Sequence, residues 1–317
     1  MQAEINLLAL FLSMVYNFST EREKKEKVNF MARKAGDRKD GVLLRDIDPM
    51  HFICPIIYPN RCDNEAYISE RIDLTNLNAY LEKKNTAGIE YNYNLFQVIV
   101  TAVLKTITLR PKMNRFIVNC NTYQRNEVSA SFVVKKQFSD NGAEALAFVH
   151  SKPTDTIDDI HNEIFRQVSE GRSDKIDPSS ESMDVFNKMP RFIGKAVVKF
   201  ICWLDRHGWV PKSLIASDPY YSSVVLTNLG SIKLHSGYHH LTNWGTNSVF
   251  VAIGERKMRP YFDDEGNVTM KDSLDLGLTI DERIADGYYY SKTVRLLKKL
   301  LENPELLETQ LSESVEY

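Results

Sequence analysis

The chain has 317 residues, of which 43% are hydrophobic, enough for one large domain or two small ones with a substantial core. Its formal net charge is −2, and no basic stripe with interleaved aromatic residues is present, so we expect no nucleic-acid partner. The four cysteines contain no Cys-x-x-Cys pair, which argues against a zinc or redox motif and favours buried free thiols in a reducing compartment.

The first forty residues differ in composition from the rest. The apolar run at 5–15 is too short to cross a membrane and follows no Lys or Arg, so it is a poor secretory signal, although it could form a docking helix. Dense mixed charge follows it, as in a solvated helix or loose tail. We predict an N-terminal extension at 1–40, a single domain at 41–310 and a tail at 311–317. We expect a cytoplasmic protein with no membrane partner.

Helices and strands then alternate without a regular rhythm. In chain order, hydrophobic periodicity predicts a strand at 66–74, a helix from Thr75 to near Lys84, a helix at 93–109, strands at 128–134 and 145–149, and a helix at 155–170. A polar loop is predicted at 173–182. The helix predicted at 189–207 is apolar enough to be packed in the core or to face a partner.

The C-terminal third is predicted to be richer in strands. Strands are expected at 222–227, 248–253, 268–270 and 274–280, with a turn at Glu265-Gly266 and a last helix at 286–301. Because the order is not a repeated βαβ unit, the pattern favours an α+β fold.

The most informative motif is Asp-Glu-Arg-Ile-Ala-Asp-Gly at 281–287. It resembles the Asp-His-Arg-x-x-Asp-Gly signature of the 2-oxoacid dehydrogenase acyltransferase catalytic domain and of the chloramphenicol acetyltransferase-like family. In that family the His is the general base for the thiol of coenzyme A or dihydrolipoamide, and Glu282 occupies its position here. Further segments match the family in the same order, so that the resemblance runs from about residue 43 to 307. They lie at 73–77, 109–114, 226–230 and 250–254.

The resemblance implies a chloramphenicol acetyltransferase-like α+β fold, a two-layer mixed sheet with packed helices, in a homotrimer whose active sites lie between subunits. It also implies coenzyme A or acyl-CoA, or another pantetheine thioester, as substrate, with no covalently bound cofactor. No lipoyl domain precedes the match in this sequence, so we expect a free-standing relative. In such a trimer Glu282 of one subunit would meet Thr227 of the next.

The resemblance assigns further roles around Thr227. This residue occupies the position of the hydroxyl that stabilises the oxyanion, although an ordinary strand residue would look the same. Asn228 and Gly230 belong to the same family motif and are candidates for substrate binding.

Asp286 and Gly287 end the signature. Asp286 could be a helix N-cap or could hold the site through a buried ion pair, for which Arg45, Arg61 and Arg283 are the candidates. Gly287 is expected to permit a close turn into the helix.

The general base is the open question. A free Glu has a pKa of about 4.3 and a thiol one of about 8.5, so Glu282 needs burial in an apolar channel to act as base. His239 and His240 could instead supply a relocated base or a ligand contact, or could be turn residues at an interface. No metal is expected, because Gly237 disfavours a helical spacing between His235 and His239. Thioester hydrolysis, or a degenerate homologue that only binds acyl-CoA or assembles, are the alternatives.

Overall fold

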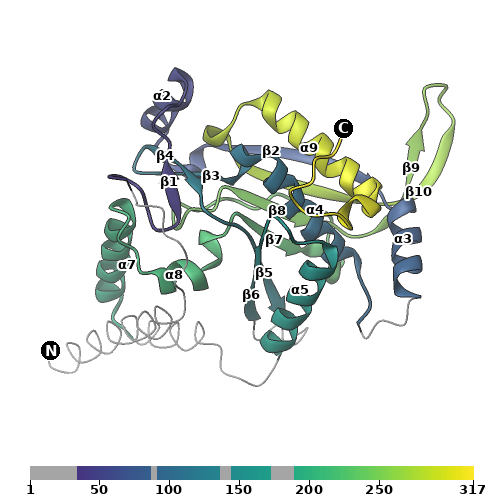
Figure 1. Ribbon diagram of the computed structural model, residues 1–317, viewed down its shortest axis with the longest axis horizontal. Coiled ribbons are helices and arrows are strands. Elements are labelled where there is room, and N and C mark those ends of the chain that lie inside the picture. The colour runs from purple at the N-terminus through teal and green to yellow at the C-terminus, as the bar shows by residue number, and fades with distance from the viewer. Residues whose placement is uncertain (1–33, 87–90, 136–143, 173–188) are drawn as a thin grey trace.

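A computed structural model of the chain describes residues 34–86, 91–135, 144–172 and 189–317. Most of the predicted N-terminal extension and the predicted loop at 173–182 lie outside these residues. The described residues form a mixed seven-stranded sheet in the order β2-β10-β8-β7-β5-β6, with β9 added to one end of β10 (Figure 1). These strands are β2 (Glu65–Asp73), β5 (Val128–Lys135), β6 (Glu144–Ser151), β7 (Val224–Asn228), β8 (Val249–Ile253), β9 (Lys257–Phe262) and β10 (Val268–Asp281).

A three-stranded sheet adjoins the large one at the end where β10 finishes. Its order is β1-β4-β3, and both pairings are antiparallel. Its strands are β1 (Gly41–Leu43), β3 (Arg115–Val118) and β4 (Asn121–Arg125). The short helix α2 (Pro49–Ile57) rises beside it (Figure 1).

Alternation along β10 divides the large sheet into two faces. Leu276, Leu278 and Ile280 point to one face and belong to the main hydrophobic core. Four helices cover that face (Figure 1). They are α3 (Thr75–Asn85), α4 (Leu95–Leu109), α5 (Ile157–Arg172) and α9 (Gly287–Glu302). Gly277 and Thr279 point to the opposite face, which carries the candidate site.

Helix α4 lies at the centre of the core and also anchors the end of the chain. It begins with a reciprocal capping box between Asn94 and Gln97. The fully buried Lys105 donates hydrogen bonds from Nζ to the backbone oxygens of Leu306 and Gln310, at 2.8 and 2.9 Å. Leu311, which was predicted to begin a tail, is therefore fully buried in the core, and the packed domain extends beyond residue 310.

The predicted α+β class is confirmed, and most predicted helices and strands are present with shifted ends. One difference concerns the strands predicted at 268–270 and 274–280, which are the two halves of the single strand β10. The elements that were not predicted from the sequence include α2, β4, β9 and the short helix α8 (Lys212–Ser217), which follows α7 (Arg191–Arg206). No helix among the described residues combines the length and apolar character that a membrane crossing requires.

Candidate functional site

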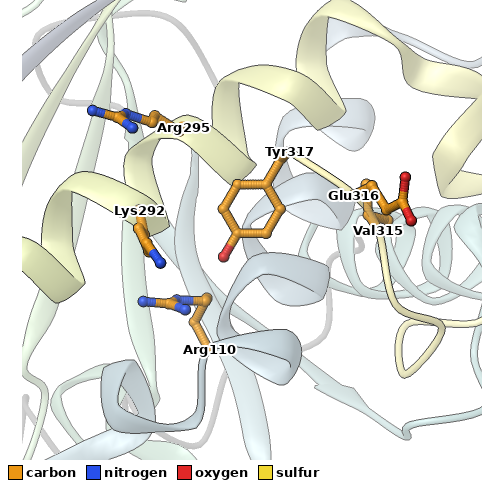
Figure 2. A pocket seen from close by; sticks show the side chains of 6 residues that line it. All are labelled: Arg110, Lys292, Arg295, Val315, Glu316 and Tyr317. Carbon is orange, nitrogen blue, oxygen red and sulfur yellow. The ribbon is translucent and has the colours of Figure 1, made fainter.

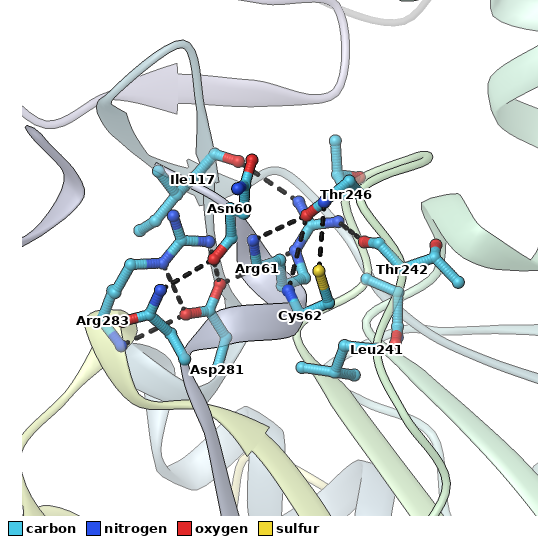
Figure 3. Close-up of polar contacts among 12 residues, drawn as sticks. Asn60, Arg61, Cys62, Ile117, Leu241, Thr242, Thr246, Asp281 and Arg283 are labelled. Carbon is cyan, nitrogen blue, oxygen red and sulfur yellow. Dashed lines mark hydrogen bonds and ion pairs between the residues drawn. The ribbon is translucent and has the colours of Figure 1, made fainter. Parts of the chain in front are cut away.

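The signature segment is fastened by a completely buried carboxylate. Asp281 accepts hydrogen bonds from Nε and Nη2 of Arg283, at 2.8 and 2.7 Å (Figure 3). Nε of Arg61 lies 3.6 Å from the same carboxylate, so two guanidinium groups share one negative charge (Figure 3). Such a charge-assisted arrangement fixes the turn that carries Glu282.

Arg61 also joins this turn to the loop that precedes β8. Its Nη1 donates to the backbone oxygens of Thr242 and Gly245, at 2.6 and 3.1 Å (Figure 3). Burial lowers the pKa of Arg61, and the charge of Asp281 opposes that effect. The signature and the loop are thus positioned by one buried side chain.

Glu282 itself is exposed on the surface of the single chain. Its backbone N–H donates to the backbone oxygen of Asn64 at 2.8 Å. The turn around it is held by Tyr290, whose hydroxyl donates to the Asp281 backbone oxygen at 3.0 Å and accepts from the Ala285 N–H at 3.2 Å. Hydrogen bonds therefore hold the backbone of the turn, but the chain's own described residues do not supply the apolar enclosure that a carboxylate base would need.

Asp286 is an exposed helix N-cap. Its side chain accepts the N–H of Tyr289 at 2.9 Å, and this bond is the main reason why its pKa is lowered. The alternative, a buried ion pair of Asp286, is not observed, because Arg61 and Arg283 both pair with Asp281.

Two other predictions about the signature need correction. Arg45 pairs with Asp37 at 3.0 Å and does not contact Asp286. Gly287 is not required by a close turn, since a Cβ at this position would meet no atom within 4 Å and its φ is not in the left-handed region. Its place as first residue of α9 imposes no need for glycine.

Thr227 lies half-buried near the end of β7, on the face that the helices leave uncovered. Its hydroxyl makes no hydrogen bond to any described residue, so it is available to a ligand. Of the two predicted substrate-binding neighbours, Asn228 caps a short turn by accepting the Ser231 N–H at 3.2 Å. Gly230 allows a close approach, because a Cβ there would lie 2.7 Å from the Gly254 backbone oxygen. Both residues thus have structural contacts.

The segment 234–241 crosses this open face of the sheet. It passes so close to β10 that a Cβ at Gly277 would collide with the backbone oxygen of Gly237. Further along, the Leu241 N–H donates to the carboxylate of Glu65 on β2, and the ring of Tyr238 lies 5.2 Å from that of Tyr67. Glycine on the sheet and polar anchors on β2 together fix the path of the segment.

This path places His239 over Phe250, on the same face of the sheet as Thr227. The His239 ring stacks on Phe250 of β8, with ring centroids 4.1 Å apart. Phe250 pairs with Val225, two residues before Thr227, in a parallel register, so Phe250 and Thr227 are on the same face, with Cα atoms roughly 8 Å apart from the strand spacing and rise. The structure therefore places two of the predicted site residues on one face of the sheet within one chain, without a direct contact between them among the described residues.

The hydrogen bond of His239 sets its tautomer. Nδ1 lies 2.9 Å from the backbone oxygen of His240, and a carbonyl oxygen can only accept. Nδ1 must therefore carry the proton, which leaves Nε2 of a neutral ring as an acceptor. His240 is exposed and stacks on His239 with centroids 4.6 Å apart.

Glu282 and Thr227 lie at opposite ends of the sheet in one chain. Thr227 is level with Ala252 and, through it, with Gly277. Glu282 is five positions further along β10 than Gly277, so the separation is roughly 16 Å along the strands, plus two strand spacings across. One chain cannot bring these two side chains together.

The described residues contain no group of three His, Cys, Asp or Glu side chains placed to hold a metal ion. A cavity of about 400 Å³ lies on the helix-covered side, between α9 and the C-terminal residues (Figure 2). It is lined by Arg110, Lys292, Arg295, Val315, Glu316 and Tyr317. Because Thr227 and His239 are on the other face of the sheet, this cavity is separate from the candidate site.

Arg61 and Arg283 were candidates from the sequence, but Asp281, the carboxylate that binds them, was not. Its position in the sequence could have indicated this role, because Asp281 is a charged residue at the end of an apolar strand and two positions before an arginine. Such a placement indicates a buried pair, since an isolated charge is not stable in a core.

Comparison with known proteins agrees with this fold. The sequence model of the 2-oxoacid dehydrogenases acyltransferase (catalytic domain) family matches residues 212–309. No curated protein sequence matches the chain. A probable dihydrolipoamide acetyltransferase from Listeria monocytogenes has a similar structure, with a TM-score of 0.52 at 16% identity over 85% of this chain and 96% of that one.

Two further solved structures lead to the same result. A chloramphenicol acetyltransferase has a TM-score of 0.52 at 12% identity, covering 82% of this chain and 99% of that one. A truncated catalytic core of the 2-oxoacid dehydrogenase multienzyme complex from Thermoplasma acidophilum has a TM-score of 0.50 at 16% identity, with coverages of 82% and 99%. The expected resemblance is thus confirmed: the chain has the fold shared by chloramphenicol acetyltransferase and the 2-oxoacid dehydrogenase acyltransferase cores, and residues 212–309 match the acyltransferase family in sequence.

Proposed function

We propose that this protein is an acyltransferase that takes the acyl group of coenzyme A, or of another pantetheine thioester, and passes it to a thiol or another small acceptor. The supporting observation is that an unbonded hydroxyl, that of Thr227, and a proton-accepting Nε2, that of His239, belong to side chains on the same open face of an acyltransferase fold. We place the reaction in the cytoplasm, since all four cysteines are unpaired, as in a reducing compartment. The expectation that these thiols are buried was wrong, because Cys62 and Cys120 are exposed and the other two are only partly buried.

The chemistry needs a base and an oxyanion donor. In the proposed reaction Nε2 of His239 takes the proton of the acceptor thiol, and the thiolate attacks the thioester carbonyl. The Thr227 hydroxyl donates to the oxygen that becomes negatively charged. The tetrahedral intermediate then expels the thiolate of coenzyme A, which recovers the proton from the imidazolium. An imidazole is closer in basicity to a thiol than a carboxylate is, so His239 fits the role better than Glu282.

We further propose that the site is completed in a homotrimer. Within one chain Glu282 and Thr227 are at opposite ends of the sheet, so Glu282 can face Thr227 only from a neighbouring copy. In that arrangement Glu282, Asp286 and the signature turn form one wall of the substrate channel, and Asn228, Gly230 and His240 belong to the other wall. Coenzyme A is bound as a substrate and not as a covalent cofactor.

A second function is favoured by one observation. The carboxylate of Glu282, where the family has its catalytic His, is exposed in the single chain. A homologue that only binds acyl-CoA, or that serves in assembly, would tolerate this exchange because neither role requires a base.

Release of free thiol from acetyl-CoA and longer acyl-CoAs, with a small thiol as acceptor, tests the proposal. We expect His239→Gln to lower turnover by at least about 100-fold and Thr227→Ala by roughly 100-fold or more, with KM little changed. Glu282→Gln should lower it by less than about tenfold, because His239 remains. His150→Gln, an exposed histidine paired with Glu127, is the matched control. Thermal stabilisation by coenzyme A without turnover would support the binding function. If the protein showed neither turnover nor stabilisation, both the catalytic and the acyl-CoA-binding functions would be refuted.

A further inference from the structure

Helix α7 carries an aromatic patch that faces away from the protein. Phe192, Phe200 and Trp203 are 69%, 51% and 46% exposed, and Trp209, just beyond the helix, is 58% exposed. Trp203 contacts Phe200 and Trp209, with ring centroids 6.0 and 5.4 Å apart. We call these four residues the aromatic patch. In Figure 1 α7 lies at the edge of the molecule, outside the large sheet.

The helix is attached through its other side. Val197 is the buried residue of α7. Asp205, the single acid of the helix, forms an ion pair with Arg38 at 2.8 Å, and that guanidinium is itself buried. The identified anchors of α7, Val197 and Asp205, are thus not residues of the aromatic patch, whose members are each about half exposed or more.

A row of cations runs beside the aromatic patch. Arg191, Lys195, Lys199 and Arg206 recur at intervals of four and seven residues, which places them on one face of the helix. All four are exposed, and none forms an ion pair with another residue in the part of the chain that the structure describes. The whole chain has a net charge of −2, so this concentration of positive charge is local.

This combination fits the surface of an anionic bilayer better than a protein partner. Trp and Phe are stable at the boundary between headgroups and acyl chains, and Lys and Arg side chains can extend to the phosphates beside them. A protein interface would have to desolvate four unpaired cations next to its apolar centre, where lysine is depleted. We propose that α7 and Trp209 form a docking surface for a membrane rich in anionic lipids.

The proposal goes beyond the acyl-transfer function and does not depend on it. It replaces the expectation of no membrane partner, which rested on the net charge of −2 and on the lack of a spanning segment in the sequence. The sequence predicted a helix apolar enough to be packed in the core or to face a partner, and the exposure of its aromatic residues in the fold favours the second alternative.

Co-sedimentation of the full-length protein with vesicles tests it. We expect binding to vesicles of phosphatidylcholine mixed with phosphatidylglycerol, much weaker binding to phosphatidylcholine alone, and weakening by high salt. Trp203 and Trp209 should show a blue shift of emission on binding, because their indoles leave water. Failure of the unaltered protein to bind the anionic vesicles would overturn the proposal.

Matched variants separate this surface from general charge and hydrophobicity. Lys195→Gln/Lys199→Gln should weaken partitioning roughly 30-fold, about fivefold per cation, whereas Lys83→Gln/Lys299→Gln, with the same change of charge on exposed positions elsewhere, should have little effect. Equal weakening by both pairs would contradict a local surface.

The aromatic residues have a control of their own. Phe200→Ser/Trp203→Ser should lower partitioning by about tenfold or more, while Phe262→Ser, 70% exposed on β9, should leave it unchanged. Thermal unfolding of each variant establishes that it folds. If the patch variants instead changed the oligomeric state and no vesicle bound, a second copy of the chain would be the occupant and the lipid proposal would be wrong.

Discussion

Asp281 is the residue on which the geometry of the signature turn depends most. Replacing it with Asn keeps the shape but leaves the buried guanidiniums of Arg283 and Arg61 without a counter-charge. Uncompensated buried charge costs about 3–5 kcal/mol, so we expect Asp281→Asn to lower the free energy of unfolding by that amount. Urea denaturation followed by circular dichroism measures it.

Asp275 supplies the control, since its carboxylate also has two arginine partners, Arg71 and Arg259, at 2.9 and 3.0 Å. These pairs are partly solvated, so Asp275→Asn should cost no more than about 1 kcal/mol. Equal losses for the two substitutions would show that the Asp281 network contributes no more than a surface ion pair.

His161 gives a pH dependence with a definite sign. The ring is buried and stacks on Tyr93 with centroids 3.9 Å apart, and burial lowers its pKa below the ordinary value of 6.5. The unfolded chain therefore binds a proton first as the pH falls. We expect the stability contributed by His161 to be complete above a pH of about 6.5 and to decline below it, toward the lowered pKa.

Urea unfolding at a series of pH values, for the unaltered protein and His161→Gln, measures this contribution. The decline on the acidic side of a pH of about 6.5 should be shallower in the variant, because its residue 161 does not titrate. Superimposable pH profiles would mean that another group causes the decline.

The sequence could not decide which aspartate of the signature pairs with the arginines. Residues 281–287 contain two aspartates, and the chain offers several arginines that could pair with either. The pairing depends on which carboxylate the sheet buries. Asp281 is the last residue of β10 and is buried with it, whereas Asp286 is at an exposed helix start. A sequence prediction places strand and helix ends only to within a few residues. It therefore cannot tell which of the two aspartates is buried.

The crossing of the segment 234–241 over β10 depends on glycine at one position. A Cβ at Gly277 would collide with the backbone of Gly237, so Gly277→Ala must displace the segment that carries His239. We expect a loss of about 1–3 kcal/mol in stability and a parallel loss of acyl-transfer activity. Thermal unfolding and turnover of one preparation measure both.

Gly287→Ala is the matched substitution in the signature. A Cβ there meets open space at the first position of α9, so stability should stay the same or rise by up to about 1 kcal/mol. Damage as large as that of Gly277→Ala would show that Gly287 has a role that the single chain does not reveal.

Element types were predictable where periodicity was strong, as for α4 and β2. The elements that were not predicted have local explanations. β9 contains Pro260, which argues against a strand, but among the described residues β9 pairs with β10 alone, so it is an edge strand in which a proline is tolerated. α2 has prolines at its first position and in its interior, and its apolar residues are mostly exposed, so it has no core-facing pattern to detect.

At the scale of the whole molecule, five short motifs in the right order were enough to predict the fold, because each motif marks a junction between a strand and a helix or turn. The site was less predictable. The placement of His239 on the same face of the sheet as Thr227 depends on the path of a loop, and no sequence period encodes that path. The sequence also could not show that Glu282 and Thr227 lie at opposite ends of one sheet, which makes assembly the decisive question.

Disulfide cross-linking answers that question without relying on activity. In a background whose native cysteines are replaced by serine, Thr227→Cys/Glu282→Cys cannot form a disulfide within one chain, because the two positions are roughly 16 Å or more apart and a disulfide needs Cα atoms within about 7 Å. If Glu282 faces Thr227 of the next copy in a closed ring, mild oxidation should link two and then three chains, and no more.

Each single-cysteine variant alone should stay unlinked, and a mixture of the two should give linked pairs but no linked triplets. Sedimentation equilibrium of the unaltered protein should independently give the mass of three chains. A monomer in sedimentation, with no linked species after oxidation, would remove Glu282 from the site and leave Thr227 and His239 to act within one chain. A ladder that continues beyond three chains would indicate an open, head-to-tail assembly, because a ring of three has no free interface left for a fourth.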